Sequence, residues 1–280
     1  MLDLPFVTLM RLLPKSALST VVGLATRAPA PAKLHQLAMR AFARAYGIQT
    51  AEAEHEVSGY GTFGEFFTRR LKDGARPVDP DERSVVSPVD GHVSQAGIAE
   101  RGQCLQDKGI WFPVEDLLGD PAQAAAFEGG SFATLYLSPR DYHRIHAPLG
   151  GQIEGYTYLP GQLWPVSPRV VRSLPSLYSL NERLVTYVAT RAGRMAVVAV
   201  GATCVARIRA AYDPIVTHSA EPGRAHRYEK AIALEKGAEV GVFEMGSTVI
   251  LLFEPGRVRW DASLTPGTQV RMGQRIGRVS

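Results

Sequence analysis

From residue 84 to the end of the chain, short apolar runs recur between glycines and prolines. Four of these runs, rich in β-branched and large apolar side chains, cover residues 132–137, 195–200, 248–253 and 275–279. Short runs bounded by turn-forming residues are typical of β-strands, because an amphipathic helix needs a longer periodic segment. The sequence therefore predicts a body over residues 84–280 that is built mainly of short strands.

The N-terminal part has a different pattern. Apolar side chains recur at helical spacing between residues 2 and 46, with breaks at Pro14 and over residues 28–32. This spacing predicts two or three amphipathic helices. The expected fold class is thus α+β and mainly β, with an N-terminal helical region and linker over residues 1–83 followed by a β-rich domain over residues 84–280.

Two further signals lie between the helices and the strands. Thr62 precedes Glu65 by three residues, a spacing that predicts a capping box at the start of another helix. Residues 72–83 are rich in Pro, Asp and Gly and predict a linker.

Basic charge is concentrated at the start of the chain. Residues 1–50 hold six Lys or Arg against one Asp, a balance of +5, while the remaining residues sum to −1. A basic amphipathic segment can lie on an anionic bilayer, or it can pack on the protein's own core, and its periodicity fits both. No uninterrupted apolar run of 18 residues occurs, so we expect no spanning helix. A nucleic-acid partner is not expected either.

The two cysteines, Cys104 and Cys204, lie a hundred residues apart. This spacing matches neither a disulfide framework nor a CxxC metal site. We expect two buried free thiols in a reducing compartment.

A weak internal repeat runs through the β-rich part. Residues 87–93, 147–153 and 270–277 each place a turn glycine before an apolar stretch. Turns of this kind recur in lipoyl-type β-sandwich modules, so duplicated lipoyl-like units are one interpretation. Coincidence among turn residues is the other.

Ser247 lies in a Gly-Ser-Thr step directly before the apolar run 248–253. Such a step predicts a turn that delivers a serine into a buried strand. Most such steps are only turns, and Gly-x-Ser-x-Gly does not occur around Ser247, so α/β-hydrolase chemistry is not supported.

His143 and His146 follow a predicted strand, in a stretch that we expect to be a loop between Pro139 and Pro148. Three interpretations stay open. Both imidazoles could simply be bonded to the backbone; together with Asp90 they could bind zinc; or one could activate a hydroxyl while Asp90 orients it. Asp90 itself precedes a glycine and could be only a turn residue.

Four short motifs follow one another along the chain: residues 87–91 (SPVDG), 136–146 (YLSPRDYHRIH), 158–161 (YLPG) and 246–249 (GSTV). Together they resemble the pyruvoyl-dependent phosphatidylserine decarboxylases, most closely the bacterial, mitochondrial-type branch. The resemblance extends from about Thr62 to the C-terminus and includes residues 72–79.

The resemblance implies a self-processing enzyme. The Ser247 hydroxyl would attack the carbonyl of Gly246, and the chain would then break between these residues, leaving a pyruvoyl group in place of the serine. By analogy, His146 is the base for this step and Asp90 its partner. The substrate amine would form a Schiff base with the pyruvoyl group, carbon dioxide would leave, and His143 would return a proton to the carbon.

The resemblance also implies partners and a location. Residues 1–246 and 247–280 would stay together as a heterodimer, with a higher homo-oligomer possible. The substrate would be phosphatidylserine in an anionic membrane, the product phosphatidylethanolamine, and the enzyme a peripheral protein on the cytoplasmic side of the cell membrane. The pyruvoyl group would be the only cofactor, and no metal is expected.

Two departures and two alternatives accompany this expectation. Met245 stands where leucine commonly precedes the Gly-Ser-Thr step, a change that conserves volume. His218 and His226, in a less familiar segment, are expected to be exposed loop residues without a role. Two rival interpretations remain. One is a pyruvoyl decarboxylase that acts on a soluble amino acid. The other is a non-catalytic lipoyl-like module that docks on membranes.

Overall fold

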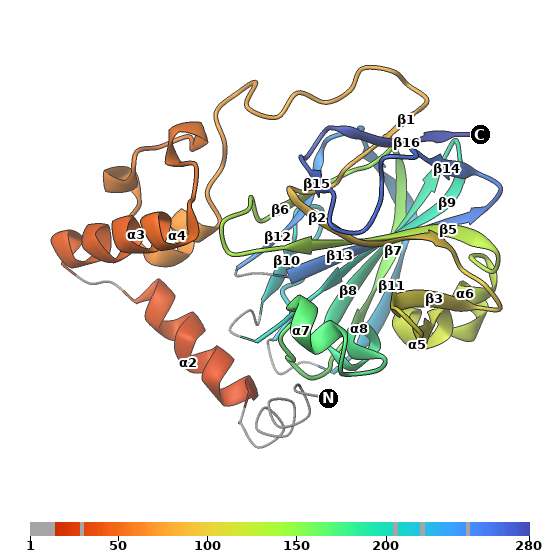
Figure 1. The fold of residues 1–280 in the computed structure, drawn as a ribbon, viewed down its shortest axis with the longest axis horizontal. Helices are drawn as coiled ribbons and strands as arrows, with labels where there is room; N and C mark the ends of the chain where they lie inside the picture. The colour runs from red at the N-terminus through yellow and green to blue at the C-terminus, as the bar shows by residue number, and fades with distance from the viewer. Residues whose placement is uncertain (1–14, 29–30, 204–206, 219–221, 245–246) are drawn as a thin grey trace.

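The computed structural model (Figure 1) describes residues 15–28, 31–203, 207–218, 222–244 and 247–280. Met245, Gly246 and Cys204 lie outside these ranges, as does the part of the first predicted helix before Lys15. Cys104 is buried and forms no disulfide in the described part of the chain, and burial raises the pKa of its thiol.

Two of the predicted amphipathic helices are present. α2 (Lys15–Arg27) and α3 (Ala32–Tyr46) meet at the predicted break, and α3 ends at Gly47, whose φ of 70° is the left-handed conformation that glycine tolerates. Both helices lie to one side of the β-rich body (Figure 1). No helix in the described ranges is long and apolar enough to cross a membrane.

The predicted capping box is confirmed. α4 (Phe63–Phe67) begins after Thr62, whose hydroxyl accepts a hydrogen bond from the Glu65 amide at 3.2 Å, while the Glu65 carboxylate accepts one from the Thr62 amide at 3.3 Å. Phe66 is fully buried against Met39 of α3. These contacts connect the N-terminal helices to one another. Residues 72–83 form neither helix nor strand.

The body is built around one antiparallel sheet of eight strands. In spatial order the strands are β11 (Arg224–Leu234), β7 (Gly151–Leu159), β8 (Arg183–Thr190), β9 (Gly193–Val200), β13 (Ser247–Pro255), β5 (Gly130–Leu137), β2 (Gly91–Ile98) and β15 (Gln269–Val270). The mainly β fold class is therefore confirmed, and so are the strands expected over residues 132–137, 195–200 and 248–253.

Smaller sheets and short helices surround this sheet. The small sheets are β1 (Ser84–Val86), β16 (Arg275–Val279) and β14 (Val258–Trp260); β10 (Ile208–Ala210), β12 (Glu239–Phe243) and β6 (Arg144–His146); and β3 (Gln103–Asp107) with β4 (Ile110–Pro113). The short helices are η1 (Thr50–Glu52), η2 (Val57–Gly59), α5 (Val114–Leu118), α6 (Pro121–Ala125), α7 (Pro168–Val171) and α8 (Leu177–Leu180).

The central strand β13 is buried on both faces. Val249 and Leu251 pack in one core with the two three-stranded sheets, whereas Ile250 and Leu252 pack in a second core with α5, α7 and α8. Side chains alternate between faces along a strand, so Ser247 shares the face of Val249. We call this the small-sheet face and the opposite one the helix face.

The three repeated segments each lead into a strand. β2 begins at Gly91, β7 begins at Gly151, and Gly273 precedes β16. The first two strands belong to the large sheet and the third to a small one. Duplication of lipoyl-like units stays a prediction.

Candidate active site

Ser247 is the first residue of β13 and pairs with Leu137, the last residue of β5. Its side chain is fully buried, and its hydroxyl has no hydrogen-bond partner among the residues that the structure describes. A buried hydroxyl without a partner costs folding free energy, so Ser247 is a candidate for a role other than stabilising the fold. Gly246, the other residue of the expected cleavage site, lies outside the described residues.

The segments that carry Asp90 and His146 lie side by side. The His146 amide donates to the carbonyl of Pro88, two residues before Asp90, at 2.8 Å. The expectation that His146 belongs to a loop is wrong, because it ends strand β6, which pairs with β12. Gly91 permits the close approach of β2 to β5, since a Cβ atom there would lie 2.4 Å from the Tyr136 carbonyl oxygen.

His146 forms two side-chain hydrogen bonds, and neither is to Asp90 or Ser247, its expected partners in self-processing. Its Nδ1 donates to the Gly237 carbonyl at 2.8 Å, because a carbonyl can only accept. Its Nε2 then accepts from the Tyr142 hydroxyl at 3.1 Å. Burial lowers the pKa of His146, and the hydrogen bond to Gly237, the charge of Glu239 and, least, the charge of Asp90 oppose that shift in part. His146 is therefore a neutral imidazole within the electrostatic reach of Asp90.

Asp90 is buried and held by an arginine. Its carboxylate accepts from Arg76 Nε at 2.9 Å and from the Met272 amide at 2.8 Å. In the described part of the chain, no hydrogen bond joins Asp90 to His146 or either of them to Ser247.

His143 is fully buried beside the strand that leads toward Ser247. Its carbonyl accepts from the amide of Phe243, the last residue of β12, at 3.0 Å. Its Nδ1 donates to the Asp141 carbonyl at 2.8 Å, which leaves Nε2 as the lone-pair nitrogen, and this atom has no partner among the described residues. Burial, with the charge of Arg69, lowers the pKa of His143 to about 3. The imidazole is thus neutral near pH 7.

Sequence reasoning did not identify Arg76 and Tyr142 as parts of the site. Both lie within stretches that carry the family resemblance, yet nothing in their spacing reveals that Arg76 meets Asp90 from 14 residues away or that Tyr142 meets His146. Burial raises the pKa of Tyr142 to about 12, so its hydroxyl stays protonated and remains a donor.

Arg76 also binds Glu52, at 2.7 Å, and this hydrogen bond lowers the pKa of Glu52. A lowered pKa in the folded state contributes stability above the unfolded value, near 4.5, that is lost as the pH falls through the folded value. We expect the melting temperature to fall more steeply below pH 4.5 in the wild-type protein than in Glu52→Gln, measured by calorimetry. Glu82→Gln, a change at an exposed glutamate, should match the wild type; equal slopes for all three proteins would contradict the prediction.

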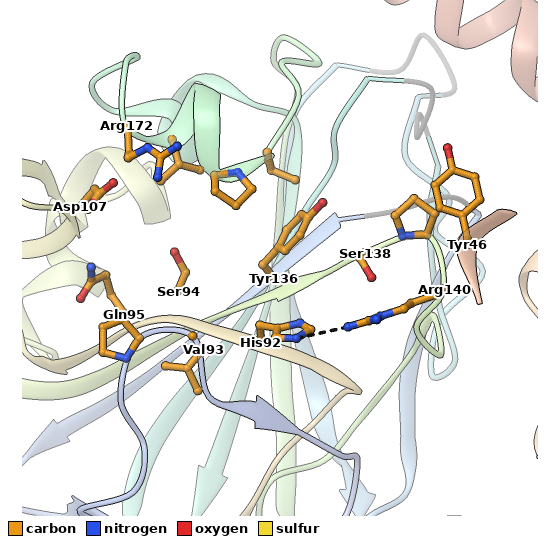
Figure 2. A pocket seen from close by; sticks show the side chains of 16 residues that line it. Tyr46, His92, Val93, Ser94, Gln95, Asp107, Tyr136, Ser138, Arg140 and Arg172 are labelled. Carbon is orange, nitrogen blue, oxygen red and sulfur yellow. Dashed lines mark hydrogen bonds between the residues drawn. The ribbon is translucent and has the colours of Figure 1, made fainter. Parts of the chain in front are cut away.

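A cavity of about 760 Å³ opens at the same end of the sheet (Figure 2). Its lining includes His92, Tyr136, Ser138, Arg140 and Arg172. Tyr136 pairs with Thr248 and projects to the helix face, and Ser138 follows Leu137, the partner of Ser247. Arg140 Nη2 lies 3.4 Å from His92 Nε2. The cavity is thus separated from the Ser247 side chain by the sheet but adjoins the end of the sheet where β13 begins.

The described residues contain no group of three His, Cys, Asp or Glu side chains placed to hold a metal ion. The zinc interpretation therefore has no support from the geometry of Asp90, His143 and His146, each of which the structure describes.

Comparison with known proteins identifies the family. Residues 63–278 match the family described as phosphatidylserine decarboxylase. A phosphatidylserine decarboxylase proenzyme of Myxococcus xanthus is 61% identical over 278 residues, covering 99% of both chains. Proenzymes of the same name from Anaeromyxobacter and Azotobacter vinelandii are 55% and 44% identical, over 98% and 100% of both chains respectively. The chain therefore belongs to the phosphatidylserine decarboxylase family, carboxy-lyases that convert phosphatidylserine to phosphatidylethanolamine.

Proposed function

We propose that this chain cuts itself between Gly246 and Ser247 and then decarboxylates phosphatidylserine with a pyruvoyl group derived from Ser247. The observation that carries the proposal is the buried hydroxyl of Ser247 at the head of a core strand, which has no hydrogen-bond partner among the described residues. Nε2 of His143 is another buried atom without a partner in the described part of the chain, and it is a lone-pair nitrogen suited to proton transfer.

The position of β13 supports the retention of both cleavage products. β13 is paired with β5 on one side and β9 on the other, and β16, later in the same product, pairs with β1. A chain of residues 247–280 would therefore keep its sheet contacts after cleavage and hold its new N-terminus in the site. This arrangement fits the expected heterodimer of residues 1–246 and 247–280.

The site residues fit a pyruvoyl group and its formation. A pyruvoyl carbonyl supplies an electron sink for decarboxylation without an external cofactor. His146 would take the proton of the Ser247 hydroxyl, and the charge of Asp90 would stabilise the imidazolium so formed. His143, kept neutral by burial, would take up a proton from water at Nε2 and return it from that atom to the reacting carbon. Tyr142 holds the ring of His146 in place.

The cavity in Figure 2 is our proposed binding site for the phosphate of the lipid, from which the amine would reach Ser247 past the end of the sheet where β13 begins. Arg140 and Arg172 line it, and guanidinium groups suit a phosphodiester because they donate in a planar fork. Its lining also includes Tyr46, the last residue of α3. The cavity therefore connects the N-terminal helices with the strand end where β13 begins.

The N-terminal helices are our proposed membrane-binding surface, on the cytoplasmic side of the cell membrane. Large apolar side chains are exposed on both: Val21 and Leu24 on α2, and Leu34 and Leu37 on α3, each about 60% exposed or more. Exposed apolar side chains beside basic residues are typical of segments that lie on an anionic bilayer.

An assay with two substrates and one surface variant tests this function. We expect the processed protein to release carbon dioxide from phosphatidylserine vesicles and not from free serine. Leu24→Asn/Leu37→Asn should bind the vesicles at least tenfold more weakly, because each fully buried leucine contributes about 1.5–3 kcal/mol. Ile98→Asn, an exposed apolar site on β2, is the control. Turnover of free serine, with no effect of the double variant on either substrate, would favour a soluble amino-acid decarboxylase instead.

A further inference from the structure

Glu182 lies in the same cross-strand row as Ser247. Val200 of β9 pairs with Arg183 on one side and with Thr248 on the other. One position further along the antiparallel strands, Gly201 therefore lies between Glu182 and Ser247. The Gly201 amide donates to the Glu182 carbonyl at 2.9 Å. Directly opposite residues in a row project to the same face, and strands are spaced about 4.8 Å apart. Glu182 and Ser247 therefore project to the small-sheet face, roughly two strand spacings apart, with a residue that has no side chain between them.

Among the described residues, His218 is the titratable partner of Glu182, and it carries a positive charge only when it is protonated. The side chain of Glu182 is 3% exposed. Its contacts are the Tyr158 hydroxyl and Nδ1 of His218, each at 3.4 Å, and the Thr217 hydroxyl. Among the described residues it has no Arg or Lys partner.

The other acidic side chains around the site are already paired with arginines. Asp90 binds Arg76, Glu239 binds Arg144 at 2.8 Å, and Glu244 lies 3.8 Å from Arg27. Glu182 differs from these residues because no arginine or lysine among the described residues neutralises its carboxylate. The carboxylate can therefore form an ion pair with a cation of the substrate. Desolvation by burial raises its pKa, which brings the carboxylate closer to the basicity of a useful proton acceptor.

The proposed function leaves one proton without an acceptor. The amine of phosphatidylserine arrives as an ammonium ion and must lose a proton before its nitrogen lone pair can attack a carbonyl. Asp90, His143 and His146 are assigned to other steps. An unpaired carboxylate in a poorly solvated site attracts an ammonium ion strongly.

We propose that Glu182 is a further catalytic residue, which binds the ammonium group of the phosphatidylserine headgroup and takes its proton. The N–H bond breaks and an O–H bond forms on the carboxylate, so the ammonium becomes a neutral amine and the carboxylate a neutral acid. The carboxylate would also favour the binding of headgroups that carry an amine. This inference rests on the proposed function, and its test separates the two.

The test compares Glu182→Gln with Glu154→Gln, the same change at a partly exposed glutamate of β7 that pairs with Arg194. Intact mass reports self-processing, and steady-state assays on phosphatidylserine vesicles report turnover. Calorimetry of the processed proteins with dihexanoyl phosphatidylethanolamine and dihexanoyl phosphatidylglycerol reports the binding of a lipid with an amine and of a lipid without one.

We expect Glu182→Gln to process and to bind both lipids with the same affinity. Its kcat should fall at least about 100-fold, within the usual range for a lost acid–base group. Glu154→Gln should behave as the wild type.

Each other outcome has a clear meaning. If Glu182→Gln processes and keeps both turnover and the preference for the amine lipid, Glu182 is not the acceptor, while the proposed function stands. If it remains a single folded chain, Glu182 acts in self-processing and the inference is overturned. Tyr158→Phe removes a contact but keeps the carboxylate; should it lose turnover as fully as Glu182→Gln, the effect would be structural and the inference wrong. A wild-type protein that neither processes nor decarboxylates would refute the proposed function itself.

Discussion

Replacing Ser247 with alanine is expected to leave one chain of 280 residues with no decarboxylase activity. The hydroxyl is the nucleophile of the proposed cleavage, and its elimination from Cβ together with the Gly246 carboxylate is what allows the serine remnant to become a pyruvoyl group. Alanine can take part in neither step. The fold should survive, because the hydroxyl forms no hydrogen bond within the described residues and its loss leaves only a small void in the core. Intact mass, a vesicle assay and thermal unfolding measure the three effects.

Ser179→Ala provides the matched control for this variant. Ser179 also carries a buried hydroxyl without a partner in the described part of the chain, but it lies in α8 on the helix face. We expect this variant to process and to decarboxylate at the wild-type rate. A Ser247→Ala protein that still splits into two chains would show that another residue is the nucleophile.

Replacement of the two histidines is expected to separate the two stages of the proposed chemistry. His146→Ala should remain a single chain, because the Ser247 hydroxyl would lose its base. His143→Ala should process but lose about 100-fold to 10,000-fold in kcat, the usual range for a missing proton-transfer group. Gel electrophoresis separates processed from unprocessed protein, and kcat is then measured on the processed fraction.

His226→Ala is the control, because His226 is an exposed residue of strand β11 with no assigned role; the expectation that it belongs to a loop is wrong. The reverse pattern, in which His143→Ala remains whole while His146→Ala processes, would exchange the two roles. The free Nε2 of His143 and the engaged Nε2 of His146 make that reversal chemically possible, so the experiment is informative either way.

Local patterns in the sequence were sufficient to predict the elements of the fold. Short apolar runs between turn residues located the strands over residues 195–200 and 248–253, and the spacing of Thr62 and Glu65 located the start of α4. These features depend on neighbours in the chain. The β-rich fold class follows from them because short apolar runs bury their side chains most readily as strands.

Contacts between distant segments could not be predicted in the same way. The sequence singled out Asp90 but not Arg76, which pairs with it, and it gave no role to His218, which contacts the buried Glu182. Pairing of strands decides which residues share a face, and that pairing is set by packing over the whole sheet. The row that joins Glu182 to Ser247 becomes visible only once the register of β8, β9 and β13 is known.

The intact mass of the purified wild-type protein under denaturing conditions tests the central claim most directly. We expect two chains, residues 1–246 and a 34-residue chain of residues 247–280, the smaller with a blocked N-terminus and a mass that matches a pyruvoyl group in place of serine. A stable single chain of 280 residues that nevertheless decarboxylates phosphatidylserine would contradict it.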